Sequence, residues 1–419
     1  MTNNISSRVP LNKEEIIVVR ISSHDAEYST PNSISTLFKI LILPLLAVPG
    51  LAFAEYGLNL PEGVTPISRD IYGLHMTIFW VCVGIAIVVF GVMIYSMVNH
   101  RKSKGAVASN FHESTTLELI WTLVPLAILI IIAVPATKVL IDLEDSSKAD
   151  MTVKITGYQW KWQYEYIDAE AQGIGFFSNL AQKSRDGITD ASVRSSNDNY
   201  LLDVDKRLVL PVNTRVRFLM TSNDVIHSWW VPDFAVKKDA NPGFINETWT
   251  NINEVGTYRG QCAELCGKDH GFMPVVVEAK TEEDFKTWLA EAKQAKQKAA
   301  EADAALLDQV VPKEELMALG EQVYMASCAA CHQPTGLGLP GVFPALKGSP
   351  IVIGDIKGHI DILLHGKPGT AMQSFAKQLS IKQIAAVITY KRNAWGNDTG
   401  DVIQPSEIQA ALDADGEAK

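Results

Sequence analysis

The sequence predicts a multidomain membrane protein with a hairpin of two membrane-spanning helices, an all-β domain and a small all-α domain, in that order. Three observations carry this prediction. Two long uncharged runs, Met76 to Val98 and Leu119 to Thr137, lie in the first third of the 419-residue chain. Short β-rich runs follow from about Met151 to Lys280, and a compact segment with helical spacing lies beyond Pro312.

Composition and cysteine spacing narrow the possible functions. The formal net charge of −10 and a pI near 5.4 argue against nucleic acid as a partner. Five cysteines are too few for a disulfide-scaffolded secreted fold. Four of them form two close pairs, and such spacing is typical of metal ligation or cofactor attachment: Cys262 with Cys266, and Cys328 with Cys331.

The first segment has the pattern of an export signal. A polar stretch leads to Lys39 and to an apolar run that ends in Ala52-Phe53-Ala54, the small-x-small pattern of a cleavage site. We expect a signal peptide over 1–54 and an outer N-terminal segment over 55–72. An uncleaved anchor is the alternative. The polar stretch is long for a signal, so the natural start could lie further along the chain.

Each uncharged run is long enough to cross a membrane as a helix, because a rise of about 1.5 Å per residue spans the roughly 30 Å hydrocarbon layer. The loop between the runs carries basic residues, and acidic residues follow the second run. The positive-inside rule therefore places the loop in the cytoplasm and the later domains on the periplasmic side of a bacterial inner membrane. A buried soluble hairpin is the alternative. We expect the first helix, the cytoplasmic loop and the second helix over 73–98, 99–116 and 117–142.

The region 143–280 is predicted to be a β-sandwich or small barrel. Turn signals such as Asn241-Pro242-Gly243 separate its β-rich runs. We expect a long polar surface loop over 168–199 and a helical linker over 281–312. The expected strands are Thr152–Ile155, Arg207–Pro211, Thr214–Met220 and Pro274–Glu278.

A set of soft ligands lies near the end of the β region. The segment from Cys262 to Met273 supplies two thiols, the imidazole of His270 and a thioether, a combination that selects copper over magnesium or calcium. His227, at the edge of an expected strand, could add a second imidazole, and two shared thiolates could then bridge two copper ions. A zinc site would not need the thioether. A disulfide between Cys262 and Cys266 is expected only without copper.

The segment Cys328-Ala-Ala-Cys331-His332 is the pattern for covalent attachment of haem c. The two thiols can add to the haem vinyl groups, and His332 can then coordinate the iron. Met372 is the only methionine after this motif and is the expected sixth ligand. His359 and His365 are the alternatives for a bis-histidine haem. The haem domain is expected over 313–396, with a loose acidic tail over 397–419.

From Tyr72 to about Lys280 the chain resembles subunit II of cytochrome c oxidase, most clearly through residues 157–166, 237–243 and the cysteine segment. The region 313–396 resembles class I cytochrome c domains, with Gly320-x-x-Val323-Tyr324 in its first helix. The resemblance implies a cupredoxin-like, all-β domain with a binuclear CuA site, followed by an all-α class I cytochrome c domain, as in caa3-type oxidases. Quinol-oxidising relatives lack the two thiols, and nitrous oxide reductase lacks the two-helix hairpin.

The resemblance also assigns roles to single residues. The CuA ligands would be His227, Cys262, the Glu264 carbonyl, Cys266, His270 and Met273. The Glu264 side chain would reach a magnesium ion at the interface with subunit I. Trp160 would be the surface residue that receives electrons, although Lys161 stands where the family commonly has Tyr. Glu118 would mark the mouth of a proton pathway. Strand packing or membrane anchoring for Trp160, and a stabilised helix N-terminus for Glu118, are the alternatives.

The resemblance implies a subunit of a haem-copper oxidase that couples oxygen reduction to proton translocation. Electrons would pass from an external cytochrome c or similar donor through haem c and CuA to haem a of subunit I. That subunit would also hold haem a3 and CuB, so oxygen reduction is expected outside this chain. Subunit III is a further expected partner. A membrane-anchored electron shuttle and a copper-handling protein remain the alternatives.

Overall fold

The computed structural model describes residues 59–110, 112–168 and 170–417. The expected signal peptide, 1–54, lies outside the described residues.

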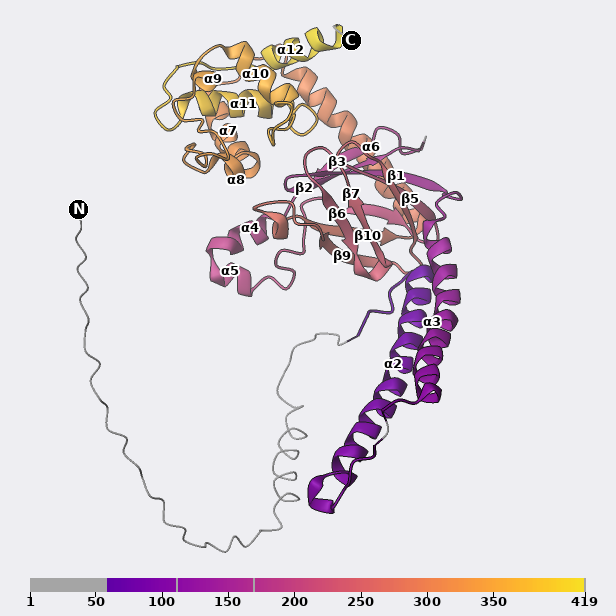
Figure 1. Ribbon diagram of the computed structural model, residues 1–419. Helices are drawn as coiled ribbons and strands as arrows, with labels where there is room; N and C mark the ends of the chain where they lie inside the picture. Colours follow the sequence, from indigo (N-terminus) through magenta and orange to yellow (C-terminus); the bar gives the residue numbers. More distant parts are fainter. Residues whose placement is uncertain (1–58, 111, 169, 418–419) are drawn as a thin grey trace, which may run out of the picture. The chain divides into compact units, whose positions relative to one another are not determined.

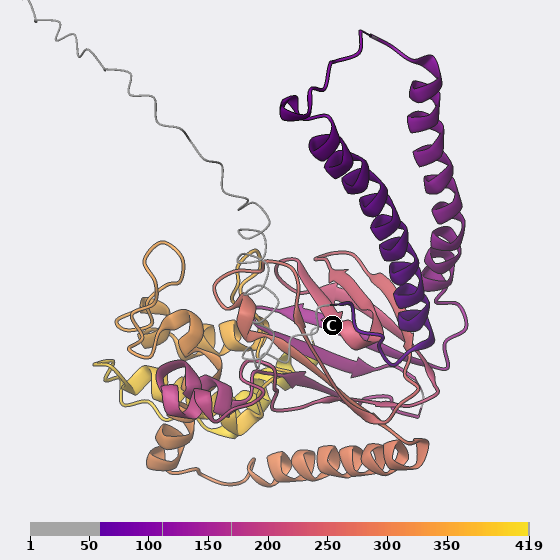
Figure 2. The same cartoon turned by 90° about the horizontal axis from the view of Figure 1, so that it is seen from below.

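Two long helices form the hairpin, α2 (Pro66–Asn99) and α3 (Thr115–Glu144), and they run antiparallel (Figure 1). The connection between them contains one short 3-10 helix, η1 (Lys102–Lys104), at the end away from the β-sheets (Figure 2). Both helices are long and apolar enough to cross a membrane. Helix α2 begins earlier than the expected residue 73, because Thr65 and Ser68 form a capping box and Pro66 occupies the first helical position.

The β region forms two five-stranded sheets. The first has the order β3-β2-β1-β5-β8, and the second has the order β4-β10-β9-β6-β7. The pairs β1–β5 and β4–β10 are parallel, whereas the other pairs are antiparallel. The strands are β1 (Met151–Tyr158), β2 (Lys161–Tyr166), β3 (Gly175–Ser178), β4 (Leu208–Pro211), β5 (Arg215–Ser222), β6 (His227–Val231), β7 (Val236–Ala240), β8 (Asn246–Asn251), β9 (Gly256–Cys262) and β10 (Pro274–Lys280).

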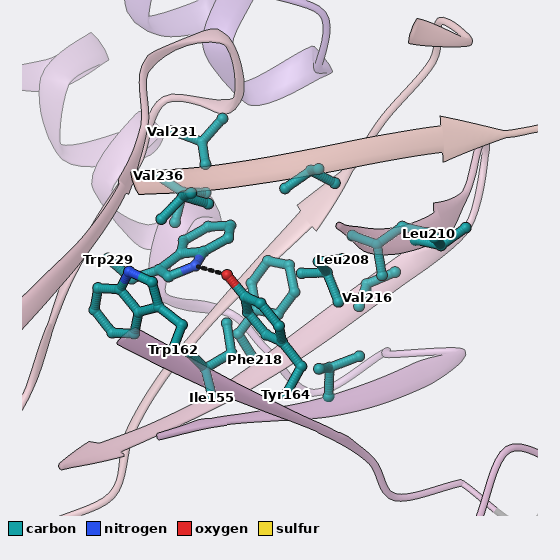
Figure 3. Close-up of a cluster of buried hydrophobic side chains, with 14 of the residues drawn as sticks. Ile155, Trp162, Tyr164, Leu208, Leu210, Val216, Phe218, Trp229, Val231 and Val236 are labelled. Atoms are coloured by element: carbon teal, nitrogen blue, oxygen red, sulfur yellow. Dashed lines mark hydrogen bonds between the residues drawn. The ribbon is translucent and has the colours of Figure 1, made fainter. Parts of the chain in front are cut away.

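The inner faces of the two sheets share one apolar core, which confirms the predicted all-β domain (Figure 3). Aromatic side chains from both sheets meet there: the Phe218 and Trp229 ring centroids lie 5.1 Å apart. The Trp229 indole donates a hydrogen bond to the Tyr164 hydroxyl at 3.2 Å, so this buried polar group is satisfied. A core of this kind holds β6 and β9 rigidly beside each other, and β6 begins at His227 while β9 ends at Cys262.

The expectation of a loop over 168–199 is wrong in part. This segment contains β3, which pairs with β2 and places Phe176 opposite Tyr164, followed by the short helices α4 (Gln182–Thr189) and α5 (Ala191–Ser195). The Asp190 side chain caps α5 by accepting hydrogen bonds from two backbone N–H groups. Because β3 has only four residues and the helices are polar, no apolar periodicity marks them in the sequence.

Helix α6 (Glu282–Ala305) follows β10 directly, with Thr281 as its N-cap. Its first turns pack on the sandwich through Phe285 and Leu289, each 6% exposed, and the Trp288 ring lies 5.4 Å from that of Tyr166. The rest of α6 is mostly exposed and polar, which fits the expected helical linker.

The C-terminal region is all-helical, as predicted. Helices α7 and α11 pack against each other at Gly320, where a Cβ atom would lie 2.2 Å from the Ala386 carbonyl oxygen. The expected loose tail is wrong, because residues 405–417 form a helix beside α11. Ile408 of this helix and Ile403, just before it, are buried. The helices are α7 (Lys313–Ser327), α8 (Ala329–His332), α9 (Pro350–Ile353), α10 (Ile356–His365), α11 (Ile381–Asn393) and α12 (Pro405–Glu417).

Candidate metal centre and haem pocket

Sulfur and nitrogen atoms from two parts of the β domain converge at one end of the second sheet. The Sγ atoms of Cys262 and Cys266 lie 3.8 Å apart, and Nδ1 of His227 lies 3.9 Å from Cys262 Sγ. On the other side, Cys266 Sγ lies 3.5 Å from both Nδ1 of His270 and Sδ of Met273. All five side chains therefore present soft donor atoms to one small volume, as expected for a shared-thiolate centre.

The Glu264 carbonyl completes this cluster. Its oxygen lies 3.3 Å from Cys262 Sγ, because the chain turns tightly between the two cysteines. The Glu264 side chain is exposed, and the neighbouring Leu265 is 79% exposed. The loop therefore directs its backbone oxygen to the sulfur atoms and its side chains outward.

His227 is fully buried, and three neighbours fix its ring. Nε2 lies 2.8 Å from the Asp224 carboxylate, which leaves Nδ1 facing the cysteines. Gly157 on β1 makes room for the ring, since a Cβ at that position would lie 2.7 Å from His227 Cδ2. The Trp162 ring stands edge-on at 5.9 Å. An acidic partner on the remote nitrogen is the usual device that orients a metal-binding imidazole.

The two thiols ionise unequally. The hydrogen bond from the Cys266 thiol lowers the pKa of Cys262. The same contact raises the pKa of Cys266. The pair therefore favours one thiolate beside one thiol, and a bound cation would be needed to hold both sulfur atoms deprotonated. The donor set fits a pair of copper ions.

The haem motif lies where α7 ends. Cys328 caps α7, and Cys331 and His332 lie on the single turn of α8. Nδ1 of His332 lies 2.9 Å from the Pro344 carbonyl oxygen, so Nε2 is left available to coordinate iron. These three residues line a cavity of about 390 Å³. Two thiols, an oriented imidazole and a cavity of this size fit a covalently attached haem c.

The expected sixth ligand, Met372, lines the same cavity from the loop between α10 and α11. Its carbonyl oxygen accepts a hydrogen bond from Lys367 N at 2.7 Å, which closes the loop. His359 also lines the cavity, whereas His365 is exposed beside Asp361 and is not among the lining residues. The structure thus brings Met372 and one of its two competitors to the haem pocket.

Trp160 connects the two sites more closely than its expected surface position implies. It is only 9% exposed, its indole donates a hydrogen bond to the Cys266 carbonyl at 3.2 Å, and it lines the cavity that Cys328 also lines. The side chain of Gln159 donates to the same carbonyl at 2.9 Å. The description of Trp160 as a surface residue is therefore wrong for this chain, because the side chain is buried between the Cys266 carbonyl and the cavity.

Lys161 is buried as well. Its ammonium donates a hydrogen bond to the Gln378 side chain and lies 5.4 Å from the Phe375 ring centroid. Burial lowers its pKa to about 8. A lysine where the family commonly has Tyr is thus accommodated by polar and aromatic contacts with the loop that carries Met372.

Glu118 lies apart from both sites, in the first turn of α3, with an exposed side chain. Its backbone N–H donates to the Ser114 carbonyl at 3.0 Å. A carboxylate in the first turn stabilises the helix N-terminus, and the exposed side chain can also contact another subunit.

Sequence patterns did not identify three supporting groups: Asp224, the Pro344 carbonyl and Gly157. Asp224 lies three residues before His227, and this spacing was the only available signal. Gly157 faces His227 from the opposite sheet, and Pro344 lies 12 residues after His332, so nothing next to the ligands in sequence marks either group.

Three family matches together cover most of the described chain. The family described as Cytochrome C oxidase subunit II, periplasmic domain, matches residues 151–280, and the corresponding transmembrane domain matches residues 54–139. The C-terminal residues 315–390 match the family described as Cytochrome C oxidase, cbb3-type, subunit III.

Individual relatives agree with these matches. A probable cytochrome c oxidase subunit 2 of Rickettsia bellii is 38% identical over 255 residues, which cover 60% of this chain and 91% of the relative. Cytochrome c oxidase subunit 2 of Cyanidium caldarium is 37% identical over 241 residues, which cover 57% of this chain and 91% of the relative. The solved periplasmic domain of subunit II from Bradyrhizobium japonicum is 41% identical over 36% of this chain and 98% of its own, with a TM-score of 0.31.

Proposed function

The chain belongs to the cytochrome c oxidase subunit II family and carries a C-terminal cytochrome c domain, and we propose that it is the electron-accepting subunit of a haem-copper respiratory oxidase. It would receive electrons from an external cytochrome c or a similar donor and deliver them to haem a of subunit I. Oxygen reduction to water, coupled to proton translocation, would take place in that partner. The proposed location is the bacterial inner membrane, with both redox domains on the periplasmic side.

The convergence of two thiols, two imidazoles, one thioether and one carbonyl is the observation that carries this proposal. The ligand set would be His227, Cys262, Glu264 through its carbonyl, Cys266, His270 and Met273. When bound there, two copper ions would supply one-electron redox chemistry. The protein's part is to keep both cysteines deprotonated and the imidazoles fixed. With six protein donors, no position remains for a substrate, which favours electron transfer over catalysis.

Four residues would hold the haem. Cys328 and Cys331 would attach it covalently, while His332 and Met372 would coordinate its iron. The Pro344 carbonyl keeps the His332 ring in the required orientation. A thioether ligand gives a higher reduction potential than a second histidine would. That potential suits a donor to a copper centre.

The proposed route between the sites runs through Trp160. Its indole is hydrogen-bonded to the Cys266 carbonyl and borders the cavity of the haem motif. A conjugated ring that reaches both places shortens the gap that an electron must cross through saturated protein. Gln159 supports the ring position by donating to the same carbonyl.

The surface toward subunit I would include the outward-facing Glu264 and Leu265. The carboxylate could contribute to a magnesium site at that interface, because a hard oxygen ligand suits this ion. Glu118, exposed at the start of α3, could serve the mouth of a proton pathway in the partner. Subunit III is proposed as a further member of the complex.

Purification of the native complex in mild detergent tests the proposal. The chain should co-purify with haem a and with oxygen consumption driven by reduced cytochrome c. Isolation of this chain alone, without haem a or oxidase activity, would contradict the proposed oxidase role and favour a membrane-anchored carrier. The covalent haem can be detected separately by peroxidase staining of the denatured chain.

A further inference from the structure

The haem pocket contains a buried cation that the proposed ligand set does not use. Lys391 is 3% exposed and lies on α11, one turn after Val387, and both side chains line the cavity that also contains Cys328 and His332. Within the described parts of the chain, no hydrogen bond or ion pair involves its ammonium group. A buried ammonium without an anionic partner is costly, so its presence indicates that a partner is missing from the protein itself.

The next residue on the helix, Arg392, is a buried cation that has hydrogen-bond partners within the protein. The Arg392 guanidinium, also 3% exposed, donates to the Asp401 carboxylate at 2.8 Å and to the Val352 carbonyl at 2.5 Å. The chain thus provides a carboxylate and a carbonyl for Arg392, and neither for Lys391. Burial lowers the pKa of Lys391 to about 8, which is the expected consequence of an uncompensated charge.

A second polar side chain, His359 on α10, lines the same cavity and is 2% exposed. Burial and the nearby Lys391 and Arg392 charges lower its pKa to about 2, so this imidazole is neutral and has a single N–H. That N–H is hydrogen-bonded to the Val352 carbonyl, and Nδ1, which has no partner among the described residues, is left as an acceptor. His359 therefore adds no second donor, and Lys391 remains without an anionic partner from the described cavity walls.

We propose that Lys391 binds a carboxylate of the haem, so that a haem propionate is the anion that this buried ammonium lacks. This inference rests on the proposed haem attachment at Cys328 and Cys331. The propionates are the only anionic groups of a haem, and the thioether bonds would hold the macrocycle inside this cavity. A buried lysine beside the haem also stabilises the reduced form, which carries one positive charge less at the iron.

The test uses the full-length chain in detergent with haem attached. Lys391→Met removes the charge and keeps the apolar stem, whereas Lys391→Arg keeps the charge. Lys382→Met is the matched control, because Lys382 lies on the same helix but pairs with Glu315 at 2.6 Å outside the cavity. Haem content, the midpoint potential and the propionate-bending band in resonance Raman spectra are measured for each.

Lys391→Met should retain the haem, lower its midpoint potential and shift the propionate band. Lys391→Arg should restore both values toward the parent chain. An unchanged potential and band in Lys391→Met, as in Lys382→Met, would overturn the inference. A lower potential with an unchanged band would also overturn it, because the charge would then lie near the haem without touching a propionate. Absence of covalent haem from the parent chain would instead contradict the proposed function.

Discussion

Asp224 and His227 form a buried pair in which the carboxylate fixes the ring that faces the cysteines: Oδ1 lies 2.8 Å from Nε2, and Nδ1 lies 3.9 Å from Cys262 Sγ. The other carboxylate oxygen accepts a hydrogen bond from the Gln159 backbone at 2.7 Å, immediately before Trp160. One acidic residue therefore positions both a proposed copper ligand and the residue beside the proposed electron route.

Replacement of Asp224 by Asn should weaken copper binding without unfolding the domain. The amide keeps the size of the side chain but removes the charge that orients the ring, and loss of such a partner commonly costs about 10–100-fold in metal affinity. Copper retention during titration with a chelator measures the effect. Asp198→Asn, at an exposed position of the same domain, is the control and should behave like the parent chain. Equal copper retention in both variants would show that Asp224 does not support the centre.

Trp160→Phe should slow electron transfer between the two sites while both cofactors remain in place. The phenyl ring cannot donate to the Cys266 carbonyl and is shorter than the indole. We expect a rate lower by about tenfold or more, equivalent to about 1.4 kcal/mol or more of barrier. Rapid photoreduction of the haem, followed at the copper absorption band, measures it. Trp230→Phe is the control, because Trp230 stacks with Lys237 and is not among the cavity residues. An unchanged rate in Trp160→Phe would exclude this route.

Met372→Ala should leave the haem attached but change its axial ligation, because the cysteines and the sixth ligand come from different segments. The charge-transfer band of the methionine-ligated ferric haem should disappear, and the reduction potential should fall. Met325→Ala, on an exposed face of α7, should leave the spectrum unchanged. A parent-like spectrum in Met372→Ala would point to His359, the competing histidine that lines the cavity.

Replacement by alanine should change the stability of the haem domain in opposite directions at two of its glycines. At Gly320 the added methyl group would meet the Ala386 carbonyl at 2.2 Å, so Gly320→Ala should destabilise the domain by about 1–3 kcal/mol. At Gly358, an exposed position inside α10, the nearest atom lies 3.8 Å away, and alanine should stabilise the helix by about 0.5–1 kcal/mol. Denaturant unfolding followed at the haem Soret band compares them. Equal stability of the two variants would contradict the packing of α7 on α11.

The sequence predicted the three-part architecture and the ligand motifs because each has a local signal. Long uncharged runs, the spacing of Cys262, Cys266, His270 and Met273, and the haem motif are all readable over short stretches. The groups that support these ligands were not predictable in this way. Gly157 meets His227 from the opposite sheet, and Lys391 reaches the haem cavity from a helix far along the chain.

Two secondary-structure elements were not predicted because the sequence around them is polar. Strand β3 has four residues and depends on pairing with β2, while the acidic segment that forms α12 buries Ile408, and Ile403 is buried just before the helix. In both places tertiary contacts stabilise elements for which the local sequence gives a weak preference. The burial of Trp160 has the same origin, because residues distant in sequence cover its ring.

Electron paramagnetic resonance of the purified, oxidised full-length chain tests the central claim most directly. Two copper ions bridged by Cys262 and Cys266 would share one unpaired electron equally. The account therefore predicts a seven-line hyperfine pattern from two equivalent copper nuclei, lost when either cysteine is replaced by serine. A four-line pattern from a single copper nucleus, or a chain that binds zinc and gives no copper signal, would contradict it.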